Sequence, residues 1–311
     1  MTTALITHPD CLNHVTPPGH PEQVARLEYI LRALSGDDFA DLRRESAPFV
    51  ADDDLLRVHP KDYVQMIRDA APVEGRRPLD ADTHMSPGSL DAALRAAGAN
   101  TKAVDMVVSG SVQNAFCAVR PPGHHAETST PMGFCLFGSV ALGAKYALDH
   151  HGLKRIAIID FDVHHGNGTQ DLVEADPRIL FISSHQMPLY PGTGSAHETG
   201  VANNVLNIPL NPGAGSTEFR SVTERSIMPA VADFDPDLIY VSAGFDAHLA
   251  DPLANLNFST QDFAWVTEKL CDLADTHCEG RLVSSLEGGY DLEALAEATA
   301  AHVRVLMERG R

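Results

Sequence analysis

The 311-residue sequence is poor in cysteine and in basic side chains. Its five cysteines are an odd number and include no Cys-x-x-Cys pair, which argues against a disulfide framework and is typical of a reducing cytoplasm. Lysine and arginine number 23 against 42 aspartates and glutamates, a formal charge of −19. Because phosphate binding requires a basic face, we expect no nucleic acid as a direct partner. Basic ligands, such as lysine side chains or polyamines, are compatible with this charge.

Long apolar runs are also missing. No run is long enough to cross a membrane, and the first residues lack the basic segment and apolar core of a signal peptide. We therefore expect a cytoplasmic protein with no membrane contact. No repeat, low-complexity linker or shift in composition divides the chain, so residues 1–311 are predicted to form one domain. The sequence is also compatible with a homo-oligomer.

What the sequence contains is an alternation of two kinds of segment. Extended, β-branched runs are predicted strands at 2–6, 114–119, 154–162, 178–184, 205–210, 237–244 and 281–288. Segments with helical spacing or rich in alanine lie between them, at 24–35, 89–107, 139–151, 216–234, 260–275 and 292–309. This order predicts an α/β fold with a central, mostly parallel β-sheet covered by helices on both faces.

Unusual polar residues follow four of the predicted strands. These are RPPGHHAE at 120–127, VHHGNG at 163–168, FDAH at 245–248 and GYD at 289–291. In open α/β sheets, ligands bind at the carboxyl ends of the strands. We therefore expect the four segments to meet at one edge of the sheet and to form a site.

The segment DFDVHHGNG suggests a metal site. Asp160, Asp162 and His164 are two residues apart, so in an extended chain their side chains point the same way. A carboxylate and the imidazole from this face, joined by Asp246 from another strand end, predict an Asp–His–Asp set, three ligands with a fourth position open, as in catalytic zinc sites. The alternative is that the aspartates cap turns and His164 is a hydrogen-bonded core residue.

Three further residues suggest catalytic chemistry beside that site: two histidines suited to proton transfer and a tyrosine. Adjacent imidazoles at His124 and His125 suit it because their unperturbed pKa lies nearest neutrality. Asp160 and Asn167 are available to orient them, although a second metal site or surface histidines would also fit the pair. Tyr290 follows two glycines and can direct its hydroxyl at a developing oxyanion, although such a residue is more often a packing residue. A second pair of adjacent histidines, at 150–151, is interpreted as part of a solvated helix end.

These motifs together resemble a known family. In the order RPPGHHAE, GFCLFGSVA, DFDVHHGNGTQ, AGFDAHLADPL and LEGGYD, preceded by HPEQVARL at 20–27, they resemble the zinc-dependent histone deacetylase superfamily. Asparagine in GNGTQ resembles the class II branch and its bacterial relatives, including acetylpolyamine amidohydrolases. The resemblance implies the three-layer arginase–deacetylase fold, in agreement with the alternation.

The resemblance implies one zinc ion per chain and a structural potassium ion. Zinc would be held by Asp162, His164 and Asp246. Potassium would be held by Asp160 and Ser183 with nearby backbone carbonyls. The implied reaction removes an acetyl or other acyl group from the ε-amine of lysine, or from a similar primary amine, with metal-activated water.

The catalytic roles carried over by resemblance are as follows. His125 would be the general base and Asn167 would support it. His124 would be its electrostatic partner, backed by Asp160. Tyr290 would stabilise the tetrahedral oxyanion.

The resemblance also implies how the substrate is bound. A narrow tunnel would hold its aliphatic stem, and a loop residue and an inner arginine would contact its two ends. The tunnel residues would be Gly133, Phe134, Tyr190 and Leu253, the loop residue Asp82, and the inner arginine, in an acetate pocket, Arg26.

The sequence departs from the family pattern in one place and leaves three other functions open. Leu136 and Gly138 replace an aromatic residue and an asparagine of the class II pattern, which puts the support of that loop in doubt. An acetylpolyamine deacetylase is the nearest alternative, although Leu253 stands where polyamine-selective relatives can carry glutamate. A ureohydrolase with two manganese ions would need a further aspartate near His165-Gly166-Asn167. A catalytically silent binding protein is the last alternative.

Overall fold

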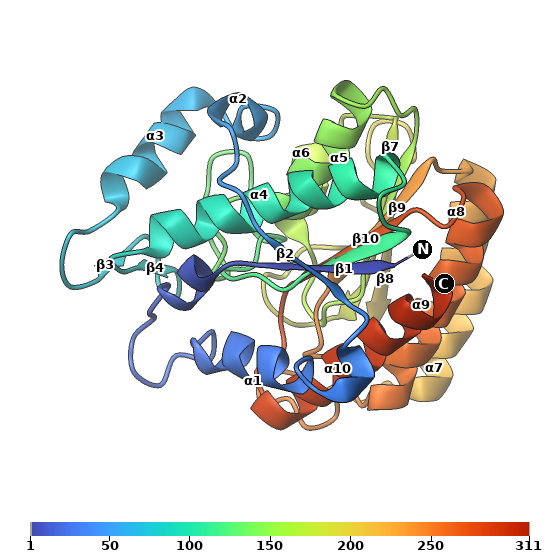
Figure 1. Cartoon of the computed structure of the whole chain (residues 1–311). Helices are drawn as coiled ribbons and strands as arrows, with labels where there is room; N and C mark the ends of the chain where they lie inside the picture. Colours follow the sequence, from blue (N-terminus) through green and yellow to red (C-terminus); the bar gives the residue numbers. More distant parts are fainter. Residues whose placement is uncertain (1, 311) are drawn as a thin grey trace.

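A parallel β-sheet of eight strands forms the centre of the computed structural model, which describes residues 2–310 (Figure 1). All seven strand pairs are parallel. In spatial order the strands are β2 (Arg43–Ser46), β1 (Thr3–Thr7), β5 (Asn114–Cys117), β10 (Leu282–Leu286), β9 (Leu238–Ala243), β6 (Ile156–Asp160), β7 (Ile179–Gln186) and β8 (Val205–Leu210).

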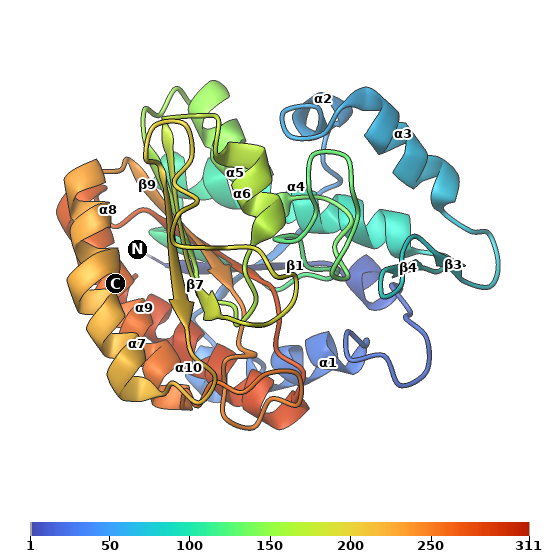
Figure 2. The same cartoon turned by 180° about the vertical axis from the view of Figure 1, so that it is seen from behind.

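Helices cover both faces of this sheet, which makes three layers (Figures 1 and 2). One face carries α4 (Ser89–Val108), α5 (Ser139–Asp149) and α6 (Asn167–Val173), with α2 (Asp52–Leu55) and α3 (Lys61–Ala70) beyond them. The other face carries α1 (Ala25–Ala33), α7 (Ser216–Val222), α8 (Met228–Phe234), α9 (Thr260–His277) and α10 (Leu292–Arg309). A two-stranded hairpin, β3 (Arg77–Pro78) and β4 (His84–Met85), lies apart from the sheet.

The strands are apolar because both faces of the sheet are covered. In β6, Ile156, Ile158 and Ile159 are completely buried, although their side chains alternate between the two faces. Burying each such side chain contributes roughly 1.5–3 kcal/mol. The polar residue of β6, Asp160, lies at the end of the strand.

The predicted α/β architecture is confirmed, and the misses concern exposed or short elements. β2, with the sequence RRES, is largely exposed at the edge of the sheet, so it lacks the apolar signal of a buried strand. The helices α2, α3 and α6 and the β3–β4 hairpin were not predicted either. A π-helical turn, Thr223–Ile227, separates α7 from α8 within the helix predicted at 216–234.

One local prediction is wrong. β6 ends at Asp160, two residues before the predicted end of that strand, so Asp162 and His164 lie in a loop. Phe161 and Val163 turn into the core and are almost completely buried. Asp160 therefore does not share a single extended face with Asp162 and His164. Its carboxylate contacts His124 instead.

The five cysteines are free and buried, as expected for a chain without a disulfide framework. Among the described residues, no helix is both long and apolar enough to cross a membrane.

His302 illustrates how buried histidines link stability to pH. It is fully buried between α10, α9 and β10, where its two ring nitrogens bond the hydroxyls of Thr267 and Ser284 at 2.7 and 2.8 Å. Burial lowers its pKa to about 3. Between that value and the ordinary pKa near 6.5, only the unfolded chain binds the proton, so stability falls as pH falls.

We expect His302→Gln to reduce this pH dependence. Glutamine offers a donor and an acceptor but does not titrate, so between pH 6 and 5 the variant should lose about 1 kcal/mol less unfolding free energy than the wild type. Urea denaturation at pH 7, 6 and 5 measures the difference. Parallel pH curves for the two proteins would show that His302 does not carry the effect.

Candidate metal centre and active site

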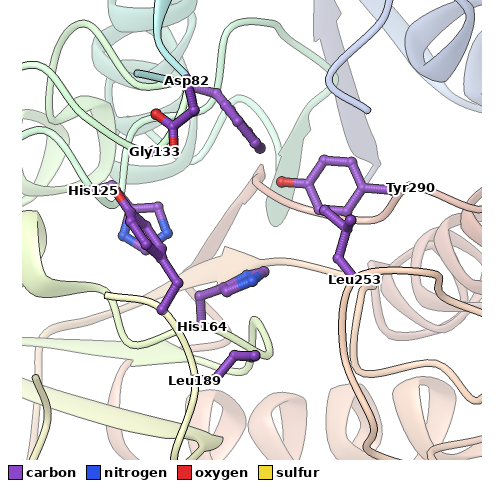
Figure 3. A pocket seen from close by; sticks show the side chains of 9 residues that line it. Asp82, His125, Gly133, His164, Leu189, Leu253 and Tyr290 are labelled. Atoms are coloured by element: carbon purple, nitrogen blue, oxygen red, sulfur yellow. The ribbon is translucent and has the colours of Figure 1, made fainter. Parts of the chain in front are cut away.

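A pocket of about 250 Å³ opens at the carboxyl edge of the sheet (Figure 3). Its walls come from the loops that follow β5, β6, β7, β9 and β10, and from the β3–β4 hairpin. The lining residues are Asp82, His125, Gly133, Phe134, His164, Leu189, Tyr190, Leu253 and Tyr290. The four polar segments of the sequence therefore do meet at one edge.

Three potential metal ligands lie at the bottom of this region. Ligand atoms of Asp162, His164 and Asp246 all lie within 4.8 Å of one another, and the three residues are buried. The Nδ1 atom of His164 is 3.1 Å from Oδ1 of Asp162 and 3.2 Å from Oδ2 of Asp246. Backbone N–H groups of His164 and Gly288 donate to Asp162, and that of Val163 donates to Asp246.

The electrostatics of this trio suit a cation. Burial disfavours a charged imidazole, yet hydrogen bonds and the charges of Asp162 and Asp246 raise the pKa of His164 to about 10. Burial, and then the charge of Asp162, raise the pKa of Asp246. Two carboxylates are therefore buried within a few ångströms of each other, and a divalent cation would neutralise their charge. Carboxylate and imidazole are suitable ligands for such an ion.

Two glycines make room for the carboxylates. A Cβ on Gly288 would lie 2.1 Å from Oδ2 of Asp246 and 2.5 Å from Oδ2 of Asp162. A Cβ on Gly244 would lie 2.0 Å from Oδ2 of Asp162. Both strand ends must therefore lack a side chain at these points for the backbone to approach the trio.

The two adjacent histidines have opposite environments. Nδ1 of His124 lies 3.0 Å from Oδ2 of Asp160, whereas Nδ1 of His125 lies 2.6 Å from Oδ1 of Asn167. Burial opposes charge on His124, but Asp162 and Asp160 raise its pKa well above the ordinary value. Burial, and then the charges of His124 and His164, lower the pKa of His125 well below it. One imidazole is therefore charged and its neighbour neutral.

The hydrogen bond to Asn167 selects the tautomer of His125. An amide oxygen only accepts, so Nδ1 of His125 must carry the proton and Nε2 must carry the lone pair. Asn167 itself is fixed because its amide donates to Oε1 of Glu127 at 2.8 Å. His125 is thus held as a neutral base.

Tyr290 lies across the pocket from His125, with its hydroxyl pointing into the pocket (Figure 3). Burial raises the pKa of this hydroxyl well above its ordinary value, so it is a donor at neutral pH. The guanidinium of Arg26 lies over the ring, 4.9 Å from its centroid. Arg26 is fully buried and bonded to Glu22, and it does not line the pocket, so its predicted contact with an acetyl group remains a prediction.

The entrance of the pocket is apolar with one acidic side chain. Phe134, Tyr190 and Leu253 line it, and the latter two are 39% and 37% exposed. Burial, and then the nearby Asp80, raise the pKa of Asp82. Thr83 connects Asp82 to Phe134 of the pocket wall, because its hydroxyl donates to Asp82 and accepts the N–H of Phe134.

The two residues predicted to hold potassium are neighbours across two strands. Asp160 of β6 pairs in register with Ser183 of β7. The Ser183 hydroxyl lies 2.9 Å from Nδ1 of His185, and Asp160 accepts the N–H of Asp162. Both side chains are completely buried.

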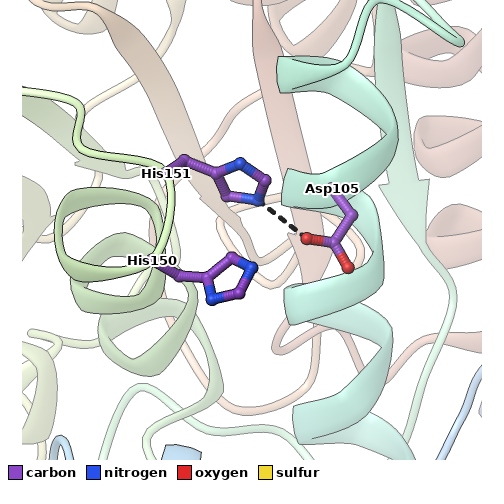
Figure 4. Close-up of side chains that lie close together, drawn as sticks. All are labelled: Asp105, His150 and His151. Atoms are coloured by element: carbon purple, nitrogen blue, oxygen red, sulfur yellow. Dashed lines mark hydrogen bonds and ion pairs between the residues drawn. The ribbon is translucent and has the colours of Figure 1, made fainter.

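A second group of possible ligands lies elsewhere. Asp105 of α4 meets His150 and His151 at the end of α5 (Figure 4). Both helices end at this point, before β5 and β6 begin, so the group lies at the edge of the sheet opposite the pocket. Oδ1 of Asp105 is 2.7 Å from Nε2 of His151 and accepts the Tyr146 hydroxyl at 3.0 Å. The side chains of His151 and Asp105 are 20% and 49% exposed, in agreement with the predicted solvated helix end.

Three residues around the pocket were not predicted. Leu189 lines it, and the buried carboxylates of Glu287 and Asp251 bond the backbone of the loops that form it. Glu287 and Asp251 lie within the motifs LEGGYD and AGFDAHLADPL, so an acidic residue beside a candidate catalytic residue was the available signal.

Comparison with known proteins finds similarity to deacetylases in both sequence and structure. Residues 20–306 match the histone deacetylase domain family. The chain is 40% identical to a probable deacetylase of Archaeoglobus fulgidus, over 94% of this chain and 82% of that one. It is 40% identical to a histone deacetylase-like amidohydrolase of Pseudomonas aeruginosa, over 89% and 74%. The crystal structure of the HDA15 HD domain superimposes with a TM-score of 0.94 at 32% identity, over 99% of this chain and 88% of that one.

Proposed function

The chain belongs to the histone deacetylase family, and we propose that it is a zinc-dependent deacylase of acyl-lysine or of a similar acylated primary amine. The observation that carries this proposal is the buried Asp162–His164–Asp246 trio, whose His164 lines the pocket, with His125 and Tyr290 on opposite walls. Zinc, when bound by the trio, would polarise an amide carbonyl and lower the pKa of water to about 7.

The proton path follows from the hydrogen bonds of His125. Its Nε2 lone pair takes the proton of the attacking water, because Nδ1 is committed to Asn167. The resulting imidazolium then protonates the nitrogen of the departing amine. His124, charged and held by Asp160, opposes premature protonation of His125 and adds positive charge near the reacting carbonyl.

Tyr290 supplies the second stabilising contact. Its hydroxyl donates a hydrogen bond to the carbonyl oxygen as negative charge develops there, a contact of the oxyanion-hole type. Phe134, Tyr190 and Leu253 contact the apolar stem of the substrate, and Asp82 at the entrance accepts from a donor beyond it. A lysine side chain, apolar along its length, suits this pocket.

Other assignments follow from the same residues. We propose that Asp160 and Ser183 hold a structural potassium ion, because their carboxylate and hydroxyl are buried on neighbouring strands. An acetylpolyamine is the second candidate substrate, favoured by the acidic side chain of Asp82 at the entrance. We also propose a cytoplasmic location from the five free cysteines, although two similar plant proteins are named as chloroplastic.

The test is turnover by protein loaded with one zinc ion per chain. We expect a fluorogenic acetyl-lysine peptide to be cleaved, the activity to disappear after chelation, and one equivalent of Zn²⁺ to restore it. Acetylputrescine, longer acyl-lysines and arginine are tested in parallel. Failure to cleave every acylated amine would support the silent binding protein, and urea production with two manganese ions would support the ureohydrolase.

A further inference from the structure

Besides the bond from Gly288 to Asp162, the side chains of Glu287, Arg26 and Asp251 attach the loop that carries Tyr290 to the rest of the protein. The carboxylate of Glu287 accepts the N–H groups of Gly123 and His124 at 2.7 and 3.1 Å. Arg26 donates to the carbonyl oxygens of Gly289 and Glu287 at 2.6 and 2.5 Å. These two attachments hold the beginning of the loop, before the tyrosine.

The third attachment acts on Tyr290 itself. Asp251, only 8% exposed, accepts the backbone N–H of Tyr290 at 2.7 Å through Oδ2. Its other oxygen, Oδ1, accepts the N–H of Leu253 at 2.9 Å. One carboxylate therefore joins the backbone of the pocket's hydroxyl donor to the backbone of a residue at the pocket entrance.

This attachment adds a restraint on the backbone of Tyr290, whose ring also contacts Arg26 and Phe134. Tyr290 follows Gly288 and Gly289, and the latter has a φ of +121°. Glycines restrict their neighbours little, so the direction of the Tyr290 side chain depends on contacts made by Tyr290. A displacement of about 1 Å at a reacting group can reduce the rate about 100-fold.

The carboxylate at this position has an electrostatic cost. Burial, and then the charge of Asp246, raise the pKa of Asp251 to about 7. An amide of the same shape would avoid this cost, but it has one acceptor oxygen where the carboxylate has two. The requirement for two acceptors explains why an ionisable group suits the position.

We propose that Asp251 is a positioning residue: by bonding the N–H groups of Tyr290 and Leu253 at once, it holds the Tyr290 hydroxyl in line with the entrance of the pocket. The inference rests on the proposed deacylase function. Asp251 does not line the pocket, so it acts through Tyr290 and Leu253, which do.

A double-mutant cycle tests the proposal. In zinc-loaded protein, we expect Asp251→Asn to lower kcat for the acetyl-lysine peptide about 10- to 50-fold with little change in KM. In the Tyr290→Phe background the same substitution should change kcat less than about 2-fold, because the hydroxyl that it misplaces is already gone. An equal loss in both backgrounds, or no loss in either, would overturn the proposal.

A matched control separates positioning from general weakening of a loop. Asp237 also accepts two backbone N–H groups, those of Lys154 and Arg155, but through the single oxygen Oδ2 and at the opposite edge of the sheet. Asp237→Asn removes the carboxylate charge there but keeps one acceptor oxygen for both N–H groups, so it controls for loss of charge and should leave kcat within about 2-fold. Metal content is measured for every variant, and zinc loss in Asp251→Asn would also contradict the proposal.

A second measurement does not depend on turnover. With 3-fluorotyrosine incorporated, the chain gives six ¹⁹F signals, and the one absent from Tyr290→Phe belongs to Tyr290. Asp251→Asn should shift or broaden that signal, whereas Asp237→Asn should not. If the wild type cleaves nothing but the signal moves, the proposed function fails and the contact stands; an unmoved signal overturns the contact.

Discussion

Asp246→Asn is expected to lose the bound metal and the activity together. Asparagine keeps the shape of the side chain and an oxygen for the N–H of Val163, so the loop can keep its fold. It removes one of two buried carboxylates that offset the charge of a divalent ion. Because loss of an indirect partner already weakens metal binding about 10- to 100-fold, loss of a ligand should lower affinity and rate at least about 100-fold.

Elemental analysis after dialysis, with turnover of the acetyl-lysine peptide, measures both effects. The wild type should retain about one zinc ion per chain and the variant almost none. The matched control is Asp105→Asn, in the exposed group at the opposite edge of the sheet. If Asp105→Asn loses the metal and Asp246→Asn keeps it, the assigned metal centre is wrong.

His125→Ala should retain zinc and lose the rate. The trio does not include His125, and we assign the acceptance of the water proton to the lone pair on its Nε2 atom. Loss of a general base typically costs about 10²- to 10⁴-fold in rate. We therefore expect kcat to fall in this range with normal metal content, and added imidazole to restore part of it.

The pH dependence gives an independent check on this role. Burial and His124 lower the pKa of His125, so the free base persists as the pH falls below neutrality. The acidic fall in kcat/KM that reports this base should be missing in His125→Ala. A variant with nearly the wild-type rate, or with the same acidic fall, would assign the proton transfer to another group, such as His124.

Much of the architecture could be predicted from local pattern. A buried parallel strand needs apolar residues on both faces, and an amphipathic or alanine-rich segment between strands needs to cover them. β6 and α10 show this plainly, so their types were predictable. The exposed β2 was missed because an edge strand in water requires no apolar residues.

The clustering of the candidate metal ligands was foreseen for a related reason. Asp162, His164 and Asp246 follow strand ends, and parallel strands bring their carboxyl ends to one edge whatever the details of the loops. The end of β6 was misjudged by two residues, yet the trio still assembles, because topology brings the loops together. The orientation of His125 by Asn167 also follows from motifs at this same edge.

The sequence by itself determined the fold class and the edge at which the chemistry gathers, since both follow from the periodicity of neighbouring residues and the direction of the strands. Only the tertiary structure decided which buried carboxylate accepts which backbone N–H group. Glu287 bonds the segment before His125, and Asp251 bonds Tyr290, across 164 and 39 residues of chain. Such bonds depend on the packing of distant loops, and no local pattern encodes which acceptor a buried N–H group will meet.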